Sequence, residues 1–231
     1  MSQANIDFLL NNNPEIIPSI VEVCPNSINP RTINENQESI TAIKNKYNIP
    51  LDKVIFIYGG NLGKPQGIDF LLEVLESNRC NDQVNFVIVG SGTEFHKLKD
   101  FINREKLVNT QLFNQLPKTD YEILANFCDV GLIFLDKRFT IPNFPSRLLS
   151  YMQASMPVLA ATDRKTDIGK VIEEGRFGYW CESNDVAEFN KKIRILCSPD
   201  IRYKMGINAR KYLENHYTAK HSYEIIMRHF N

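Results

Sequence analysis

The sequence predicts an α/β fold with a doubly wound, parallel sheet of six strands. Six short apolar runs alternate with stretches of helical periodicity, and they lie at residues 53–58, 84–90, 110–114, 130–135, 158–161 and 177–181. Their continuous apolar character, without alternating polar residues, is typical of strands that are covered on both faces. Glycine-rich or proline-rich turns follow several runs directly, as in successive βα units. Ligands of such sheets bind at the carboxyl ends of the strands.

Helical periodicity fills the intervals between these runs. We expect helices at residues 38–47, 68–77, 93–105, 118–127 and 167–175, and then three more without an intervening strand at 185–197, 199–216 and 218–230. Residues 1–50 lack this alternation. A short helix near residues 6–10 is broken by NNNP, and residues 21–24 form one short strand that Pro25 ends. We therefore interpret residues 51–231 as the main domain and residues 1–50 as a linker with the remnant of another domain.

The composition argues against several classes of function. With 27 basic and 27 acidic residues the formal charge is zero, which disfavours a general nucleic-acid-binding protein. The five cysteines are scattered and form no CxxC pair, which indicates a reducing compartment and no structural zinc site. The sequence shows neither a signal peptide nor an apolar run near the roughly 18 residues of a membrane span. We therefore expect a cytoplasmic protein, a placement compatible with peripheral contact at the inner membrane face.

The first glycine-rich turn, GGNLGKPQG at residues 59–67, follows the run at 53–58 directly. It has neither the GxxxxGK[ST] spacing of a Walker loop nor the GxGxxG spacing of a dinucleotide fingerprint. Gly59 and Gly60 allow the backbone to approach a ligand closely, and Lys64 places a cation at the mouth of the sheet. A tight turn with an exposed lysine is the alternative interpretation.

A second turn lies within residues 139–161 and connects two apolar runs. Its prolines cannot continue a strand, and a helix begins at Ser146, which we expect to act as N-cap, and stops at Pro157. Arg147 adds a fixed charge that suits a phosphate. The alternative is that Ser146 only caps the helix and Arg147 is solvated. Because both turns lie at carboxyl ends of strands in one sheet, their two cations and the helix N-terminus together suit a diphosphate.

No catalytic or metal-binding set stands out in the sequence. None of the four histidines has a Cys, Ser or Asp at the spacing of a nucleophile or metal site, and we expect all of them to be solvated: His96, His216, His221 and His229. We therefore name no catalytic residue, no metal and no cofactor.

With these residues in place, the chain resembles the C-terminal, donor-binding half of a family 4 glycosyltransferase of the two-domain GT-B fold. The resemblance runs from Val21 to the end of the chain. It rests on VEVCPNSI, similar to the interdomain linker, on YGGNLGKPQGIDFLLE, similar to the first donor-domain turn, and on two further segments, FNQLPKTDYEILANFCDVGLIFL and FPSRLLSYMQASMPVLAA. The PSR-LLSYM form resembles a subgroup that acts in capsule and lipopolysaccharide assembly. The resemblance implies a Rossmann-like donor domain at residues 51–231 and a remnant of the acceptor domain at 1–50.

The resemblance also implies which residues bind the nucleotide sugar. It places the diphosphate at Lys64, Ser146 and Arg147, the base at the backbone near Leu116 and the ribose at Ser150. The complete implied set is Gly59, Gly60, Asn61, Lys64, Leu116, Pro145, Ser146, Arg147, Leu148 and Ser150. The sequence also departs from the family pattern. Pro142 and Ser150 stand where two glutamates are usual, and Asn61 stands where many members carry arginine.

The implied activity is transfer of a sugar from a nucleotide sugar, with UDP favoured, to a lipid-linked or polysaccharide acceptor. No metal is expected, because the lysine, the arginine and the helix N-terminus can stabilise the departing diphosphate. Transfer needs both substrates in one water-poor cleft. We therefore expect an N-terminal acceptor domain or a separately encoded half as partner, and poor transfer by this chain alone. A non-catalytic nucleotide-sugar-binding module is the alternative, and the missing dinucleotide fingerprint disfavours a sugar-nucleotide epimerase.

Overall fold

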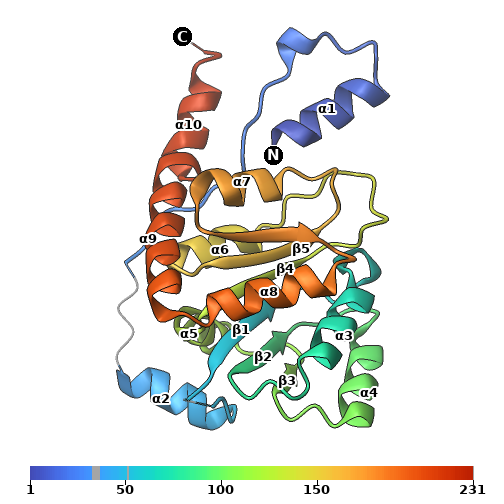
Figure 1. The fold of residues 1–231 in the computed structure, drawn as a ribbon. Helices are drawn as coiled ribbons and strands as arrows, with labels where there is room; N and C mark the ends of the chain where they lie inside the picture. The colour runs from blue at the N-terminus through green and yellow to red at the C-terminus, as the bar shows by residue number, and fades with distance from the viewer. Residues whose placement is uncertain (33–36, 51, 231) are drawn as a thin grey trace.

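The computed structural model describes residues 1–32, 37–50 and 52–230. It contains a six-stranded parallel sheet with helices on both faces (Figure 1), which confirms the predicted fold class. The strand order is β3-β2-β1-β4-β5-β6, so the chain winds outward from β1 in one direction and from β4 in the other. The point of reversal, between β1 and β4, is where open α/β sheets bind their ligands.

Each predicted apolar run forms a strand. The strands are β1 (Val54–Gly59), β2 (Val84–Val89), β3 (Thr110–Phe113), β4 (Val130–Phe134), β5 (Val158–Thr162) and β6 (Gly178–Glu182). Alternate residues of a strand point to opposite faces of the sheet. In β1, Phe56 packs into the apolar cluster on one face and Ile57 into the cluster on the other. Burial on both faces explains why these runs show no polar alternation.

Two layers of helices cover the sheet. One face carries α3 (Ile68–Ser77), α4 (Phe95–Glu105) and α8 (Val186–Leu196). The other carries α2 (Gln37–Lys46), α5 (Lys118–Phe127), α6 (Arg147–Gln153), α7 (Ile168–Gly175) and α9 (Pro199–His216). The bounds of α3, α5 and α9 are those predicted, and the other helices differ from prediction only at their ends. Across the described residues, no helix has the apolar length that crossing a bilayer requires.

The N-terminal segment lies at one end of the domain, where its extended stretch contacts the last helix (Figure 1). It comprises α1 (Gln3–Asn12), a short 3-10 helix η1 (Pro18–Ile20) and an extended stretch that reaches α10 (Ala219–Met227). The predicted strand at residues 21–24 is wrong. Pro25 has no N–H to donate, and the neighbour is a helix, so no ladder forms. The stretch is held instead by an isolated bridge between Ile28 and Thr218 and by the Ser222 hydroxyl, which donates to the Pro25 carbonyl at 3.2 Å.

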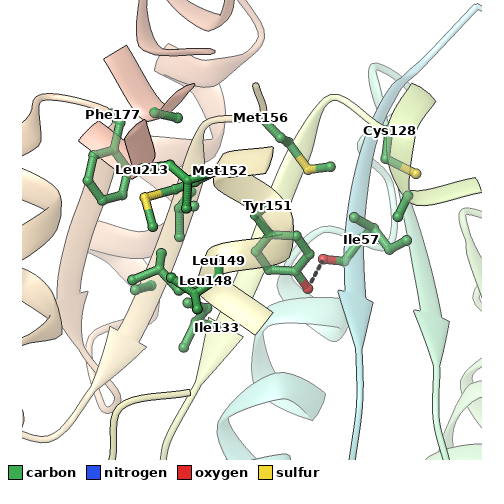
Figure 2. Packing of buried hydrophobic residues seen from close by; sticks show 14 of the residues in the cluster. Ile57, Cys128, Ile133, Leu148, Leu149, Tyr151, Met152, Met156, Phe177 and Leu213 are labelled. Carbon is green, nitrogen blue, oxygen red and sulfur yellow. Dashed lines mark hydrogen bonds between the residues drawn. The ribbon is translucent and has the colours of Figure 1, made fainter. Parts of the chain in front are cut away.

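Tyr151 of α6 fills the place where β1 and β4 separate. These strands pair over only two residues, whereas β1 pairs with β2 over six. The Tyr151 hydroxyl accepts the Gly59 N–H at 3.2 Å and donates toward the carbonyls of Ile57 and Leu132, at 3.2 and 3.3 Å. Figure 2 shows the hydroxyl directed at the Ile57 carbonyl. Tyr151 therefore replaces ladder hydrogen bonds that the diverging strands cannot make with each other.

The surroundings of Tyr151 are fitted to this role. A Cβ at Gly131 would lie 2.4 Å from the Tyr151 ring, so glycine is required at that position of β4. Burial raises the pKa of the Tyr151 hydroxyl well above its usual value, so the group stays protonated and can donate. Leu148 and Leu149 of the same helix pack into the core beside Ile133 (Figure 2). Helix α6 is thereby fixed to the sheet by both polar and apolar contacts.

We expect Tyr151→Phe to destabilise the fold, because the Gly59 N–H and two carbonyls lose a buried partner. The free energy of unfolding, measured by urea denaturation, should fall by roughly 1–3 kcal/mol. Tyr203→Phe is the control, since Tyr203 is 72% exposed and its hydroxyl should contribute nothing measurable. Equal stabilities of the two variants would contradict the role assigned to Tyr151.

Candidate functional site

The turn after β1 is locked against the turn after β2. The Gly60 N–H donates to the Val89 carbonyl at 2.9 Å, and the Leu62 N–H donates to the Ser91 carbonyl at 2.8 Å. The approach is so close that a Cβ at Gly90 would lie 1.8 Å from the Gly60 carbonyl oxygen. Gly60 itself has φ +142°, a conformation that favours glycine. The first turn is therefore held rigidly at the carboxyl edge of the sheet.

Arg147, the first residue of α6, reaches into this turn. Its guanidinium carbon lies 4.3 Å from the centre of the Tyr58 ring, and its Nη2 donates to Gln66 Oε1 at 3.1 Å. The same Nη2 lies 3.0 Å from where a Cβ on Gly60 would stand. The two turns that the sequence singles out thus meet at one place. We call it the Arg147 crevice, defined by Tyr58, Gly60, Gln66 and Arg147.

The Arg147 guanidinium has no acidic partner among the described residues. Its Nη1 is buried and, within the same part of the chain, has no hydrogen-bond partner. The nearby tyrosines do not supply negative charge. Burial raises the pKa of Tyr58, Tyr121 and Tyr151, and the opposing effect of Arg147 does not cancel it. Arg147 as a whole is half-buried, but a guanidinium with a buried nitrogen and no counter-ion is still costly, so the crevice favours an anionic ligand.

Ser146 occupies the N-cap position of α6, as expected, but its side chain does not cap the helix. Ser146 already has helical backbone angles, φ −61° and ψ −22°, and its side chain makes no capping hydrogen bond. The helical turn begins one residue earlier, where the Leu148 N–H donates to the Pro145 carbonyl at 3.1 Å. Because α6 has only seven residues, we assign the positive character of the crevice to Arg147 and not to the helix terminus.

The remaining predicted residues differ in how accessible they are. Lys64 is exposed in the 3-10 turn η2 (Lys64–Gln66), and no ion pair in the described chain involves it. Leu116 is half-buried in the loop after β3, and Ser150 is exposed on α6. The Leu148 side chain is fully buried in the core, so only its backbone is available to a ligand.

Backbone groups account for the other predicted positions. The Asn61 carbonyl accepts the Tyr58 hydroxyl at 2.6 Å, and the Asn61 side chain is exposed. Gly59 is covered by Tyr121, whose hydroxyl oxygen would lie 1.8 Å from a Cβ at that position. Pro145 is buried.

No group of three or more His, Cys, Asp or Glu side chains suited to a metal ion is found in the described part of the chain.

Four residues that shape the crevice are not singled out by the sequence. Tyr58 and Tyr151 lie in apolar stretches, where aromatic residues are expected to be core. Tyr121 lies in an amphipathic helix, and Gln66 is a neutral residue in a turn. The available signal is the place of Tyr58 directly before the two glycines, near the carboxyl end of a strand, where sheets of this kind bind their ligands.

The family model for glycosyl transferases group 1 matches residues 39–212, well over half of the chain. The chain belongs to this family. It is 27% identical over 172 residues to the probable glycosyltransferase WbjE of Pseudomonas aeruginosa, which covers 74% of this chain and 42% of WbjE. It is 25% identical over 137 residues to WcaI of Escherichia coli K12, named for colanic acid biosynthesis, which covers 58% of this chain and 33% of WcaI. This group 1 chain therefore aligns with less than half the length of either relative.

Solved glycosyltransferase structures share the fold of this group 1 chain. Anabaena Alr3699/HepE in complex with UDP matches with a TM-score of 0.77 and 17% identity, over 99% of this chain and 62% of that one. WaaG, a glycosyltransferase involved in lipopolysaccharide biosynthesis, matches with a TM-score of 0.68 and 16% identity, over 92% of this chain and 57% of WaaG. These likenesses confirm the α/β fold expected of a GT-B glycosyltransferase.

We expect Gly60→Ala to destabilise the fold by roughly 1–3 kcal/mol, because the added Cβ combines an unfavourable φ with close contact to Arg147. Gly63→Ala is the matched control. Gly63 has φ −102°, and a Cβ there would first meet the Asn61 side chain at 3.2 Å. We expect the control to be as stable as the unmodified protein or slightly more so in urea denaturation. If both variants lost the same stability, the close packing of Arg147 on Gly60 would be disproved.

Proposed function

We propose that the Arg147 crevice binds the diphosphate of a nucleotide sugar, in particular a UDP-sugar. The observation that carries this proposal is the guanidinium held at the reversal point of the sheet with no acidic partner in the described chain. A diphosphate supplies the missing negative charge and accepts charge-assisted hydrogen bonds. Structural neighbours support the choice of nucleotide, since HepE is described with UDP and with UDP-glucose, and TarM with UDP.

The proposed roles follow from the geometry. Gln66 and Tyr58 hold the Arg147 guanidinium in place, so little side-chain freedom is lost when the ligand binds. The absence of a side chain at Gly60 lets the guanidinium lie against the turn, and Lys64 adds an exposed cation on the same turn.

The rest of the nucleotide sugar is assigned to neighbouring positions. We place the base at the backbone near Leu116 and the ribose at the exposed hydroxyl of Ser150. Pro142 is buried and its carbonyl accepts a hydrogen bond from Asn5 Nδ2 at 2.7 Å, so this position offers the sugar no carboxylate. Backbone groups of Gly59, Asn61, Pro145, Ser146 and Leu148 complete the proposed donor site.

In the proposed reaction the bond between the anomeric carbon and the diphosphate oxygen breaks. An acceptor hydroxyl oxygen forms the new bond and releases its proton. Arg147 and Lys64 stabilise the negative charge that develops on the leaving diphosphate. We name no general base.

We further propose that residues 51–231 are the donor domain of a family 4 enzyme of the capsule and lipopolysaccharide type. Residues 1–50 would be its linker and a remnant of the acceptor domain. The names of WcaI and WaaG, which refer to colanic acid and lipopolysaccharide biosynthesis, support a polysaccharide or lipid-linked acceptor. Transfer requires an acceptor-binding half, in the same protein or encoded separately, because both substrates must share one cleft. The share of WbjE that this chain matches, 42%, is consistent with that requirement.

Arg147→Ala should weaken UDP binding by roughly 1.5–3 kcal/mol, about ten- to a hundredfold in Kd, since a charged hydrogen-bonding partner is lost. Isothermal titration calorimetry with UDP measures this directly. Arg138→Ala is the control, because Arg138 follows β4 but is paired with Asp136 at 2.6 Å and lies outside the crevice. Unchanged UDP affinity in Arg147→Ala would remove the proposed diphosphate site.

Lys64→Ala should also weaken UDP binding, by about tenfold at low ionic strength. Because Lys64 is exposed, its contribution should shrink as salt is added, whereas the half-buried Arg147 should keep most of its effect. Calorimetry of both variants at low and high salt tests this difference. Lys211→Ala, on the exposed side of α9, serves as the control and should bind as the unmodified protein does. A Lys64 effect that is absent at low salt would exclude this residue from the site.

A further inference from the structure

Tyr47 joins the two ends of the loop to which the base of the donor is assigned. Loop 114–117 lies between β3, which ends at Phe113, and α5, which begins at Lys118. The rings of Tyr47 and Phe113 pack edge to face, with their centres 5.3 Å apart. The Tyr47 hydroxyl donates to Asp120 Oδ2, in the first turn of α5, at 2.5 Å. One side chain therefore holds both the residue before the loop and the helix that follows it.

The backbone that carries Tyr47 is fixed to the domain independently of the loop. Ile43 and Ile49, on either side of Tyr47 in sequence, are both buried in the core. The Ile49 N–H donates to the Lys44 carbonyl at 2.9 Å, and Lys44 Nζ lies 4.6 Å from the centre of the Phe127 ring, at the far end of α5. Tyr47 thus projects from a firm support at the end of α2.

The bond from Tyr47 to Asp120 is charge-assisted at neutral pH. Desolvation, followed by the bond to Asp120, raises the pKa of Tyr47, so its hydroxyl stays protonated and donates. Hydrogen bonds from Lys46 and then from Tyr47 lower the pKa of Asp120, so the carboxyl group stays ionised and accepts. Lys46 reaches the same oxygen at 2.6 Å, but its side chain is 56% exposed, and exposed ion pairs contribute little. The hydroxyl of Tyr47 is therefore the main restraint on Asp120.

The loop between these two ends carries backbone groups that a base can use. Its first two residues are exposed, and the Leu116 side chain packs partly against the core. In the described structure, no backbone–backbone hydrogen bond uses the N–H or the carbonyl of Leu116. One donor and one acceptor are thus free to pair with the edge of a base. Where they stand depends on how firmly the two ends of the loop are held.

We propose that Tyr47 is a positioning residue for the base of the donor nucleotide. By holding Phe113 and Asp120, it keeps the backbone of loop 114–117 in the arrangement that pairs with the base. Without this restraint the loop must be ordered when the nucleotide binds, which lowers the affinity. The role rests on the proposed nucleotide-sugar site and deepens it. It also gives the segment 1–50, interpreted above as a linker and remnant, a direct share in nucleotide binding.

Tyr47→Phe tests the proposal on the full chain, because it keeps the ring beside Phe113 and removes only the bond to Asp120. Titrations should show the affinity for UDP lowered by about three- to tenfold. The affinity for inorganic pyrophosphate, which has no base, should stay unchanged. Asp120→Ala should act in the same direction, and the double variant should bind UDP no more weakly than Asp120→Ala alone, because the same bond is removed. Tyr203→Phe is the matched control, since Tyr203 is 72% exposed and loses the same hydroxyl.

Hydrogen exchange of the free protein adds a readout that needs no ligand. The Tyr121 N–H donates to the Pro117 carbonyl at 3.0 Å, where α5 leaves the loop. In Tyr47→Phe this amide should exchange at least about threefold faster, with a smaller change in β5, because only the start of α5 is loosened.

The outcomes separate this proposal from the donor site. Equal losses of UDP and pyrophosphate affinity, or equal acceleration of exchange at Tyr121 and in β5, would overturn the proposal, because Tyr47 would then act on the fold as a whole. Unchanged UDP affinity in Tyr47→Phe, in protein that binds UDP before the change, would overturn it and leave the donor site intact. If the unmodified protein bound neither UDP nor pyrophosphate, the donor site itself would be refuted, and the role of Tyr47 with it.

Discussion

The separation of β1 from β4 is the constraint on which the rest of the structure depends. Two parallel strands that part leave backbone groups without partners, and the Tyr151 hydroxyl takes up the Gly59 N–H and two carbonyls at that point. Arg147 lies four residues before Tyr151 in α6, so both side chains share one face of the helix. Helix α6 therefore both supplies the hydrogen bonds that β1 and β4 cannot make with each other and positions the Arg147 guanidinium in the crevice. Both results follow from one orientation of the helix.

The Arg147 guanidinium is the clearest exception to the rule that buried polar groups are satisfied. Its Nη1 has no partner in the described chain, and three neutral tyrosines surround it. A residue placed in this way reduces the stability of the empty protein and increases the gain when an anion binds. Breaks in local consistency of this kind are expected where a fold has been adapted to a ligand.

The sequence predicts the sheet well because its evidence is repeated in every βα unit: each buried strand reads as an apolar run, and each crossover as a helix. The prediction at residues 21–24 was wrong because a short apolar stretch looks the same whether its neighbour is a strand or, as here, α10. Within the site, the cation at Arg147 was predictable from its place after a loop at the sheet edge. The hydrogen bond from Arg147 to Gln66 was not predictable, since tertiary packing alone brings the turn after β1 close to α6. For the same reason, the structure was needed to show that α6 has only seven residues and that the Ser146 side chain does not cap it.

The extended stretch before α2 contacts the last helix, so the two ends of the chain are joined. Glu22 pairs with both Arg228 and His229 at 2.8 Å, and the Ser222 bond to Pro25 spans 197 positions of sequence. Chain ends usually fray independently of each other. Here the two ends are held against each other, so fraying at one loosens the other, and the two should exchange their amide hydrogens as a single cooperative unit.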